Sequence, residues 1–347
     1  MKEPLKVAVV GCGRISQVHL PRLKTSDLYE VAGVADVNED AARSRAEEFG
    51  VPRWERDYRA FAAEPGVDAL WVLTPAAVHA EVAVTALRAG KHVFCEKPMA
   101  RTVAQAESMA EAARESGRVL LIGYVMRHSP DALNLRKIIR DGRIGRPVFY
   151  RDIWALAKGN PSPSVHDAEL GGGIVYEHAH WLDFVSFVFG PAKKVYASTM
   201  RFKPDDTTAD DTFVVIIDFE SGDRAVWSES WAALGMGWEP IAVGRKVRPV
   251  LDIIGPKGSI HFPDADGAKV LSLYDSKDQD KAPTEQWAWE QDWGANIVSF
   301  ENEHKHFFQC VREGATPNPS PEEALAANAL AEAIMESSRT GETVHLA

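Results

Sequence analysis

The fold is decided by a stretch near the amino terminus, Val7–Ser16, which reads "VAVVGCGRIS". Four apolar residues run into a turn that contains Gly11 and Gly13, and a helical pattern follows from Ser16. Glycines at a strand-to-helix turn let the backbone approach a pyrophosphate, and the amino terminus of the helix stabilises the negative charge. Such a turn can also be purely structural, so the surrounding sequence must decide between the two interpretations.

A carboxylate follows at the spacing that a dinucleotide site requires. Asp36 ends the second strand-like run, 20 residues after Ser16, where it would hydrogen-bond the ribose hydroxyls of an adenosine. Its negative charge would repel the additional phosphate of NADP, and the segment "ADVNED" contains no Arg or Lys behind it. We therefore expect a dinucleotide site, with NAD rather than NADP as the cofactor.

The first part of the chain, from Leu5 to Tyr124, alternates short apolar runs with helical patterns. The runs are "LKVAVVG", "YEVAGVAD", "DALWVLT", "KHVFCE" and "RVLLIGY". Their hydrophobicity is continuous rather than alternating, which indicates strands covered on both faces. Residues 1–125 are therefore predicted to form an α/β domain with a Rossmann-type, doubly wound parallel sheet.

The pattern changes after residue 125. A strand "VFYRDIWAL" and an apolar helix "IVYEHAHWLDFVSFVFG" precede two hairpin signals, "DTFVVIIDFESGDRAVWSESWA" and "VLDIIGPKGSIHF". Helical spacing returns in residues 294–338, which could pack on either domain. Residues 126–347 are thus predicted to form an α+β domain with a large, mostly antiparallel open sheet.

Composition restricts the partners of the protein. The net charge of −11 disfavours nucleic acid and anionic membrane surfaces, because both reward clustered Lys and Arg. Cys12, Cys95 and Cys310 lie too far apart for a disulfide framework or a zinc motif. The first residues lack the apolar core of a signal peptide, so we expect a cytoplasmic location. A small molecule is the expected partner.

A charged pair ends one of the predicted strands. The segment "KHVFCE" runs into Glu96, Lys97 and Pro98. Ligands of doubly wound sheets bind beyond the carboxyl ends of the strands, so this triplet is predicted to border the cofactor. A buried lysine with a lowered pKa can transfer protons, whereas an ion-paired or solvated lysine would have no catalytic role. Position alone leaves both interpretations open.

The order of several motifs carries a family resemblance. Besides the glycine turn, the motifs are "TPAAVHAEVAVTALRAGKHVFCEKPMA", "GYVMRHSP", "GGGIVYEHAHWLDFV", "IIGPKGSI" and "FENEHKHFFQCVREG". The chain resembles the family of glucose-fructose oxidoreductases, inositol dehydrogenases and rhizopine-catabolism proteins over nearly its whole length. The resemblance implies a nicotinamide-dependent oxidoreductase of a sugar or polyol. It also implies that Lys97 lies beside the nicotinamide and the reacting hydroxyl.

The apolar helix of the second domain contains a cluster of ionisable residues. Glu177, His180 and Asp183 are spaced by three and share one helical face, whereas His178 points roughly 100° away from Glu177. Members of the family usually have a histidine four positions after the acidic residue; here the spacing is three. A structural ion-paired network is the alternative. Metal binding together with His166 lacks a supporting spacing, so we expect no metal.

Other segments are predicted to border the site. By resemblance, Thr74, Pro75 and His79 line the nicotinamide ribose; the alternative is an ordinary Thr-Pro helix entry. Met126 and Arg127 follow the last strand of the first domain, where Arg127 borders the substrate unless it pairs with an acidic neighbour. The segment "FENEHKHFF", which contains His304 and His306, is predicted to be a solvated helix face without a special role.

The second domain offers neutral and acidic partners for hydroxyl groups. The loop "AKGNPSPSVHDAELGGG" contains Asn160, His166 and Asp167. Basic residues near the site are few, namely Arg127, Arg151 and Lys158, and scattered cations bind phosphate poorly. We therefore expect an uncharged substrate rather than a sugar phosphate.

The sequence thus predicts an NAD-dependent dehydrogenase that oxidises a secondary hydroxyl of a sugar, glycoside or cyclic polyol, with Lys97 and His180 as the acid-base pair. A redox-neutral enzyme with retained NAD and a non-catalytic NAD(P) sensor are the alternatives. A homodimer or homotetramer through the second sheet is expected. The predicted cofactor-binding residues are Gly11, Gly13, Arg14, Ile15, Asp36, Thr74, Pro75, His79, Glu96, Lys97 and Met126; the predicted substrate-binding residues are Lys97, Arg127, His166, Glu177 and His180; and the predicted catalytic residues are Lys97, His180 and Glu177.

Overall fold

Two compact units make up the chain in the computed structural model. One unit contains Met1–His128 and Ile297–Asn328, and the other contains Ser129–Asn296 and Ala329–Ala347. Thus a segment near the carboxyl terminus belongs to the same unit as the amino terminus. The structure describes residues 3–155, 162–232, 250–262, 270–275, 282–288 and 297–346.

The first unit is built on a six-stranded parallel sheet with the strand order β3-β2-β1-β4-β5-β6. This confirms the predicted Rossmann-type sheet. The five predicted runs are all strands, and the edge strand β3 is too short to give a sequence pattern. The strands are β1 (Leu5–Val10), β2 (Tyr29–Ala35), β3 (Trp54–Glu55), β4 (Ala69–Val72), β5 (His92–Glu96) and β6 (Leu120–Gly123).

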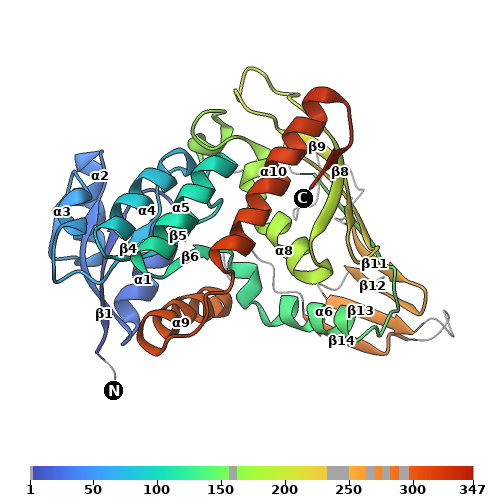
Figure 1. The fold of residues 1–347 in the computed structure, drawn as a ribbon, viewed down its shortest axis with the longest axis horizontal. Coiled ribbons are helices and arrows are strands. Elements are labelled where there is room, and N and C mark those ends of the chain that lie inside the picture. Colours follow the sequence, from blue (N-terminus) through green and yellow to red (C-terminus); the bar gives the residue numbers. More distant parts are fainter. Residues whose placement is uncertain are drawn as a thin grey trace, which may run out of the picture. The chain divides into compact units, whose positions relative to one another are not determined.

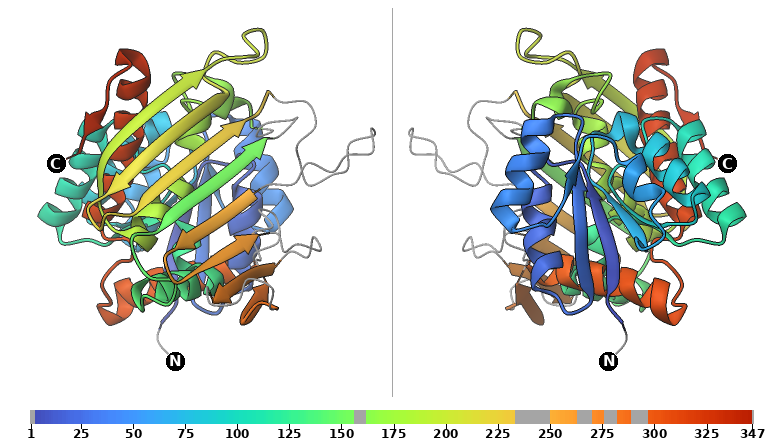
Figure 2. Two further views of the ribbon diagram at one scale, coloured as in Figure 1. Left: turned by 90° about the vertical axis from the view of Figure 1, so that its right-hand side faces the viewer. Right: turned by 90° about the vertical axis from the view of Figure 1, so that its left-hand side faces the viewer.

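Helices connect these strands and cover both faces of the sheet. Right-handed crossovers from β1 outward and from β4 outward put their helices on opposite faces. In Figure 1 and in the right view of Figure 2, α1 and α2 lie on one face, α4 and α5 lie on the other, and α9 lies beside α1. The helical segments are α1 (Ser16–Thr25), α2 (Glu39–Phe49), α3 (Arg59–Ala62), η1 (Ala76–Val78), α4 (His79–Arg88), α5 (Val103–Ser116), η2 (Val125–His128) and α9 (Ile297–Glu313).

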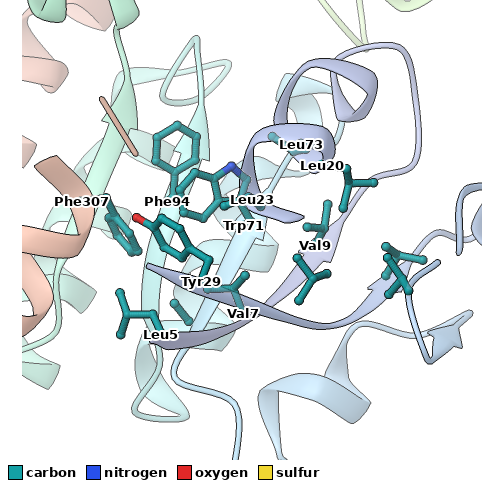
Figure 3. Close-up of a cluster of buried hydrophobic side chains, with 14 of the residues drawn as sticks. Leu5, Val7, Val9, Leu20, Leu23, Tyr29, Trp71, Leu73, Phe94 and Phe307 are labelled. Atoms are coloured by element: carbon teal, nitrogen blue, oxygen red, sulfur yellow. The ribbon is translucent and has the colours of Figure 1, made fainter. Parts of the chain in front are cut away.

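Aromatic side chains fill the core between the sheet and α9. Trp71 of β4 stacks on Phe94 of β5 with ring centroids 4.1 Å apart, and Phe307 of α9 meets both rings edge-on. Tyr29 of β2 also lies edge-on to Trp71 (Figure 3). These four side chains are buried. Burial of this apolar surface fixes α9 to the parallel sheet, because each aromatic ring removes a large area from water.

The second unit is built on a nine-stranded sheet with the order β14-β13-β12-β11-β7-β10-β9-β8-β15. Among the described strands, only the pair β7 and β10 is parallel, so the predicted mostly antiparallel sheet is confirmed. Both predicted hairpins form. The strands are β7 (Phe149–Ala155), β8 (Ala192–Met200), β9 (Thr212–Phe219), β10 (Arg224–Ser230), β11 (Val250–Gly255), β12 (Gly258–Phe262), β13 (Val270–Asp275), β14 (Glu285–Ala288) and β15 (Val344–His345).

One face of this sheet packs against helices of its own unit. Tyr150 of β7 contacts Phe189 of α8, and Ala197 of β8 donates its backbone N–H to Ser337 of α10. Among the described residues, no helix lies over the opposite face, which the left view of Figure 2 shows. The helical segments are α6 (Pro130–Arg140), η3 (Pro163–His166), α7 (Ile174–Glu177), α8 (Ala179–Phe189) and α10 (Pro321–Thr340), the last of which spans both units.

The predicted apolar helix of the second unit is interrupted. It forms two helices, α7 and α8, which are separated at His178 (φ −85°, ψ 21°). Glu177 therefore ends one helix, whereas His180 and Asp183 belong to the next. The expectation that these three residues share one continuous helical face is wrong. None of the described helices is both long and apolar enough to cross a membrane.

Candidate functional site

The glycine turn after β1 is sterically closed on one side and open on the other. Gly11 has φ +102°, and a Cβ atom there would lie 2.6 Å from the backbone carbonyl of Leu73. Gly13 has open space around its Cα, and its carbonyl accepts a hydrogen bond from Ser16 Oγ (2.6 Å). No side chain caps the helix α1 that starts at Ser16. The N–H groups of Ser16, Gln17 and Val18 donate to backbone carbonyls within the turn, so the helix dipole and the open space at Gly13 are the features that suit an anion such as a pyrophosphate.

Asp36 is held at the carboxyl end of β2, beside this turn. Its Oδ2 accepts the N–H of Cys12 (2.8 Å), and its Oδ1 accepts the N–H of Asn38 (2.9 Å). Burial, with a smaller contribution from Asp36, raises the pKa of the Cys12 thiol to about 12, so this cysteine stays protonated. Asp36 is thus oriented by the backbone and keeps acceptor capacity for ribose hydroxyls. Arg14 is exposed and Ile15 half-buried at the start of α1.

The turn after β4 contributes a buried hydroxyl without a partner. Among the described residues, Thr74 Oγ1 is buried and has no hydrogen-bond partner. The ring of His79 lies between two carbonyl oxygens, with Nδ1 2.8 Å from Pro98 O and Nε2 2.8 Å from Thr74 O. Burial lowers the pKa of His79 despite these two acceptors. His79 thereby ties this turn to the Glu-Lys-Pro triplet, while Pro75 is exposed.

The triplet lies at the end of β5, next to β4 in the sheet. Glu96 Oε2 accepts the backbone N–H of Lys97 (3.0 Å), and Glu96 Oε1 lies 2.9 Å from His19 Nε2. The Lys97–Pro98 peptide bond is cis. Because β2, β1, β4 and β5 are neighbours, the structure brings Gly11, Asp36, Thr74 and Glu96 to one edge of the sheet. A site with an open glycine turn, an oriented carboxylate and an unpartnered hydroxyl suits a dinucleotide.

Arg127 has protein partners in the first unit. Its Nη1 donates to Asn318 Oδ1 (3.0 Å) and to Glu323 Oε2 (2.7 Å), and the side chain is buried in η2 next to the buried Met126. This is the pairing with an acidic neighbour that the sequence left open. Contact of Arg127 with a substrate stays a prediction.

The segment that contains His304 is not a solvated helix face. Glu303 is fully buried and His304 is 3% exposed, because this side of α9 packs on the aromatic core and on α1. His304 Nε2 lies 2.9 Å from His19 Nδ1, and His306 Nε2 accepts the N–H of Asn318 (3.0 Å). The prediction is wrong because the polarity of a residue does not by itself decide which side of a helix faces solvent. Glu303 and His304 lie three and four positions after Phe300, and Phe307 lies three positions after His304, so helical spacing puts them on one side.

In the second unit, His180 lies in the first turn of α8 and is buried with Asp183, one turn further along. Glu177 is half-buried at the end of α7. The tight turn before α7 contains Gly173 (φ +80°), where a Cβ atom would lie 2.6 Å from the carbonyl oxygen of Asp210. This turn and the break at His178 fix where both helices begin.

His178 has a partner that the sequence did not indicate. Its Nε2 lies 2.8 Å from Oε1 of Glu229 on β10, and Trp231 Nε1 donates to the same oxygen (3.2 Å). The neighbouring strand β7 presents Asp152, which accepts hydrogen bonds from Tyr150 Oη (2.7 Å) and from the indole of Trp154. Burial, and less strongly the charge of Glu229, raise the pKa of Asp152 to about 8. The inner face of the sheet thus carries two buried carboxylates, which only strand pairing brings together.

The remaining predicted substrate residues of this unit differ in position. His166 packs its ring against Trp231 with centroids 5.3 Å apart. Asp167 Oδ1 accepts the N–H groups of Glu169 (2.8 Å) and Leu170 (2.9 Å), so it stabilises a local turn. Asn160 and Lys158 lie outside the described residues.

Arg151 does not lie near His180, contrary to the expectation. It alternates along β7 with Tyr150, which faces α8, so Arg151 points to the opposite face. There it pairs with Asp252 of β11, which also pairs with His261 Nδ1 (2.7 Å). Within the part of the chain that the structure describes, no group of three or more His, Cys, Asp or Glu side chains could hold a metal ion.

Known proteins are similar to this chain in sequence, in fold or in both. D-apiose dehydrogenase of Paraburkholderia graminis is 28% identical over 98% of this chain and 89% of its own length. Myo-inositol 2-dehydrogenase of Thermotoga maritima is 29% identical over 66% of this chain and 70% of its own. An oxidoreductase domain protein of Kribbella flavida has a TM-score of 0.83 at 26% identity, with both chains fully covered. Levoglucosan dehydrogenase in complex with NADH and levoglucosan has a TM-score of 0.84 at 23% identity, with 99% of both chains covered, which shows the same fold.

Family models match both parts of the chain. Residues 5–124 match the oxidoreductase family model with an NAD-binding Rossmann fold, and residues 132–261 match the carboxyl-terminal domain of the same family. The first match contains the glycine turn and the Glu-Lys-Pro triplet, and the second contains α7, α8 and the pair His178 and Glu229. The chain belongs to the family of glucose-fructose oxidoreductases, inositol dehydrogenases and rhizopine-catabolism proteins, and it has the NAD-binding Rossmann domain of that family.

Proposed function

We propose that the protein is a dehydrogenase that oxidises a secondary hydroxyl of an uncharged sugar, glycoside or cyclic polyol with NAD. The observation that carries the proposal is the edge of the first sheet, where the open glycine turn, Asp36 and Thr74 Oγ1 lie beside Lys97. The relatives named for apiose and inositol support the substrate class. When bound, NAD supplies the hydride acceptor.

In this proposal Lys97 and His180 are the proton-transferring groups. The substrate hydroxyl loses its proton to one of them as the hydride leaves the same carbon. The proton and the hydride thus leave the substrate in one step. Glu96 fixes the backbone at Lys97 through its hydrogen bond to the lysine N–H. His180, buried at the start of α8, is held by the helix rather than by a loop. Glu177 assists as a substrate ligand.

The same proposal assigns NAD rather than NADP to the site. Asp36 accepts two backbone hydrogen bonds and so keeps its carboxylate at the ribose position, where it repels a 2′-phosphate. The following residue, Val37, is 82% exposed and offers no cation to such a phosphate.

The experiment is a kinetic panel with NAD in excess. Free pentoses, inositols, glycosides and the phosphates of the same sugars are compared by the absorbance of reduced nicotinamide. We expect catalytic efficiency for an uncharged member and little for its phosphate, because Arg127 and Arg151 already have carboxylate partners. Higher efficiency with the phosphate contradicts the substrate class. Conversion of a glycoside without net reduction of NAD identifies a redox-neutral enzyme instead.

We also propose that two or more copies associate through the outer face of the second sheet. Apolar side chains protrude from four strands of that face, β7, β8, β9 and β11, around the ion pair of Arg151 and Asp252. Aromatic residues and Arg are enriched in protein interfaces. Ile153→Asp should lower the mass measured by light scattering, and an unchanged mass argues against this face. The protruding residues are Phe149 (38% exposed), Ile153 (37%), Tyr196 (47%), Val214 (43%) and Ile254 (41%).

The redox state of the three cysteines is relevant to the cellular compartment of the protein. Cys12, Cys95 and Cys310 are all buried and free, which suits a reducing environment such as the cytoplasm. A cytoplasmic enzyme is therefore part of the proposal, and fractionation of cells that express the tagged protein tests it.

A further inference from the structure

A chain of hydrogen-bonded side chains crosses the interior of the first unit and ends at the residue before Lys97. Trp71 Nε1 donates to Nδ1 of His19 (3.1 Å), and Nε2 of His19 lies 2.9 Å from Oε1 of Glu96. His304 Nε2 lies 2.9 Å from the same Nδ1 of His19. The four residues come from β4, α1, β5 and α9, and none is more than 6% exposed. Such a chain has few ways to arrange its protons.

The indole of Trp71 decides where the proton of His19 lies. An indole nitrogen can only donate a hydrogen bond, so a proton on Nδ1 of His19 would face the N–H of Trp71 at 3.1 Å, donor against donor. Nδ1 is therefore the acceptor, and Nε2 carries the proton. His304 must then donate through Nε2 to reach the same lone pair. The geometry favours neutral His19 in the Nε2–H tautomer.

This assignment fixes the carboxylate of Glu96. Its Oε1 accepts the Nε2–H of His19, and its Oε2 accepts the backbone N–H of Lys97. A carboxylate with both oxygens engaged, one of them by a buried ring, cannot rotate without breaking a hydrogen bond that water does not replace. Glu96 thereby connects a tautomer in the core with the backbone at Lys97.

We propose that Trp71 and His19 are positioning residues: the indole N–H holds His19 in its Nε2–H tautomer, and His19 in turn holds the Glu96 carboxylate that orients Lys97. The consequence for turnover rests on the proposed catalytic role of Lys97. The consequence for the tautomer does not depend on it, because it follows from the hydrogen bonds within the first unit alone.

The groups that face His19 do not supply another charge to its Nδ1. Glu303 of α9 is fully buried, and burial raises its pKa well above the usual value, with Glu96 adding to the shift. Burial lowers the pKa of His304 well below its usual value, and the charge of Arg22 lowers it further. Tyr29 of β2 donates its hydroxyl to the carbonyl oxygen of His304. Glu96 is thus the carboxyl group that His19 contacts, and the contact is on the Nε2 side of the ring.

Trp71→Phe removes the indole N–H and keeps an aromatic ring against Phe94. The probe is the pair of imidazole nitrogen resonances of His19 in histidine labelled with nitrogen-15, assigned by their loss in His19→Gln. We expect the Nε2–H tautomer in the unchanged protein and, in Trp71→Phe, a proton that also reaches Nδ1 in the same buffer. Trp54→Phe removes an indole of β3 that is not part of this chain of hydrogen bonds. It should leave the His19 resonances unchanged.

Kinetics supply the second readout, with His19→Gln and His19→Leu as a matched pair. The Gln amide can still donate to Glu96 Oε1, whereas Leu cannot. We expect kcat to fall about tenfold or more in His19→Leu, with the Kd for NAD within about twofold, and His19→Gln to recover most of the loss. A purely structural role would lower the unfolding midpoint of both variants and leave kcat of the folded enzyme unchanged.

Two results would overturn the proposal. One is a His19 that carries its proton on Nδ1, or on both nitrogens, in the unchanged protein at neutral pH. The other is equal kcat in His19→Leu and the unchanged protein. Lys97→Ala, which tests the proposed function, leaves the His19 resonances in place, so a failure of that function is distinguishable from a failure of this inference.

Discussion

Each unit holds a pair of histidines close to its proposed site residues, and the two pairs are held in different ways. In the first unit, His19 and His304 bond to each other and come from helices separated by 285 positions in sequence. In the second unit, His178 and His180 are near neighbours in sequence but are separated by a helix break. His178 Nε2 lies 2.8 Å from Glu229 Oε1 on a distant strand, whereas His180 lies in the first turn of the next helix. Separation in sequence therefore does not indicate which histidines contact each other, because tertiary packing decides the partner of each ring.

The comparison gives different expectations for mutation of the two units. The first pair is part of a buried chain that ends at Glu96, so changes there should act on Lys97 through its backbone. In the second pair, His178 lies against Glu229 of the sheet, whereas His180 is proposed to transfer a proton. The following predictions test this difference.

The largest effect is expected for Lys97→Ala. Turnover should fall by a factor of about 100 or more, because general acid-base catalysis contributes this much. Binding of NAD, measured by fluorescence quenching, should stay close to that of the unchanged protein, because Asp36 and the glycine turn are untouched. Near-normal turnover would remove Lys97 from catalysis and leave the first pair of histidines without a proposed target.

His180→Ala and His178→Ala should separate the second pair. His180→Ala should lower kcat by at least about tenfold, as expected for an acid-base residue. His178→Ala removes the imidazole that lies 2.8 Å from the buried carboxylate of Glu229 and should lower the free energy of unfolding by about 1–3 kcal/mol. Denaturant titration and steady-state kinetics are measured on both variants. If His178→Ala loses turnover at unchanged stability, His178 acts in catalysis and the proposed division between a catalytic His180 and a structural His178 is wrong.

The buried carboxyl of Asp152 should make stability depend on pH. Its pKa is raised from 3.8 to about 8, so the folded state binds more protons than the unfolded state between these values. The stabilising contribution is present at low pH and is lost as pH rises toward 8, with a slope of up to about 1.4 kcal/mol per pH unit. Asp152→Asn should remove this slope from the free energy of unfolding. Glu303, whose pKa is also raised, contributes with the same sign in both proteins and cancels in the difference. An identical pH dependence would contradict the assignment.

A smaller change is expected for coenzyme preference. Asp36→Ser combined with Val37→Arg removes the repulsive carboxylate and places a cation at an exposed position. The ratio of catalytic efficiencies with NADP and NAD should rise by about tenfold. Val37→Ala is the matched control and should leave the ratio unchanged. An unaltered ratio in the double variant would show that Asp36 does not contact the ribose.

Local patterns predicted much of the fold. Continuous apolar runs gave the five longer strands of the parallel sheet, and hairpin signals gave β9, β10, β11 and β12, because strand length and turn chemistry are encoded within a few residues. Strand β3 has only two residues, and the break at His178 lies inside an apolar segment, so neither leaves a periodic signal.

The sequence by itself determined the glycine turn, the carboxylate at the end of β2 and the triplet at the end of β5, since in a parallel sheet each lies at the same edge. The family could also be inferred from the order of the motifs. Tertiary structure alone decided that His19 meets Glu96 and His304, that His178 meets Glu229, and that Arg151 faces away from α8. These contacts join residues far apart in the chain, and burial of an aromatic core and the register of paired strands place them, which no local pattern encodes.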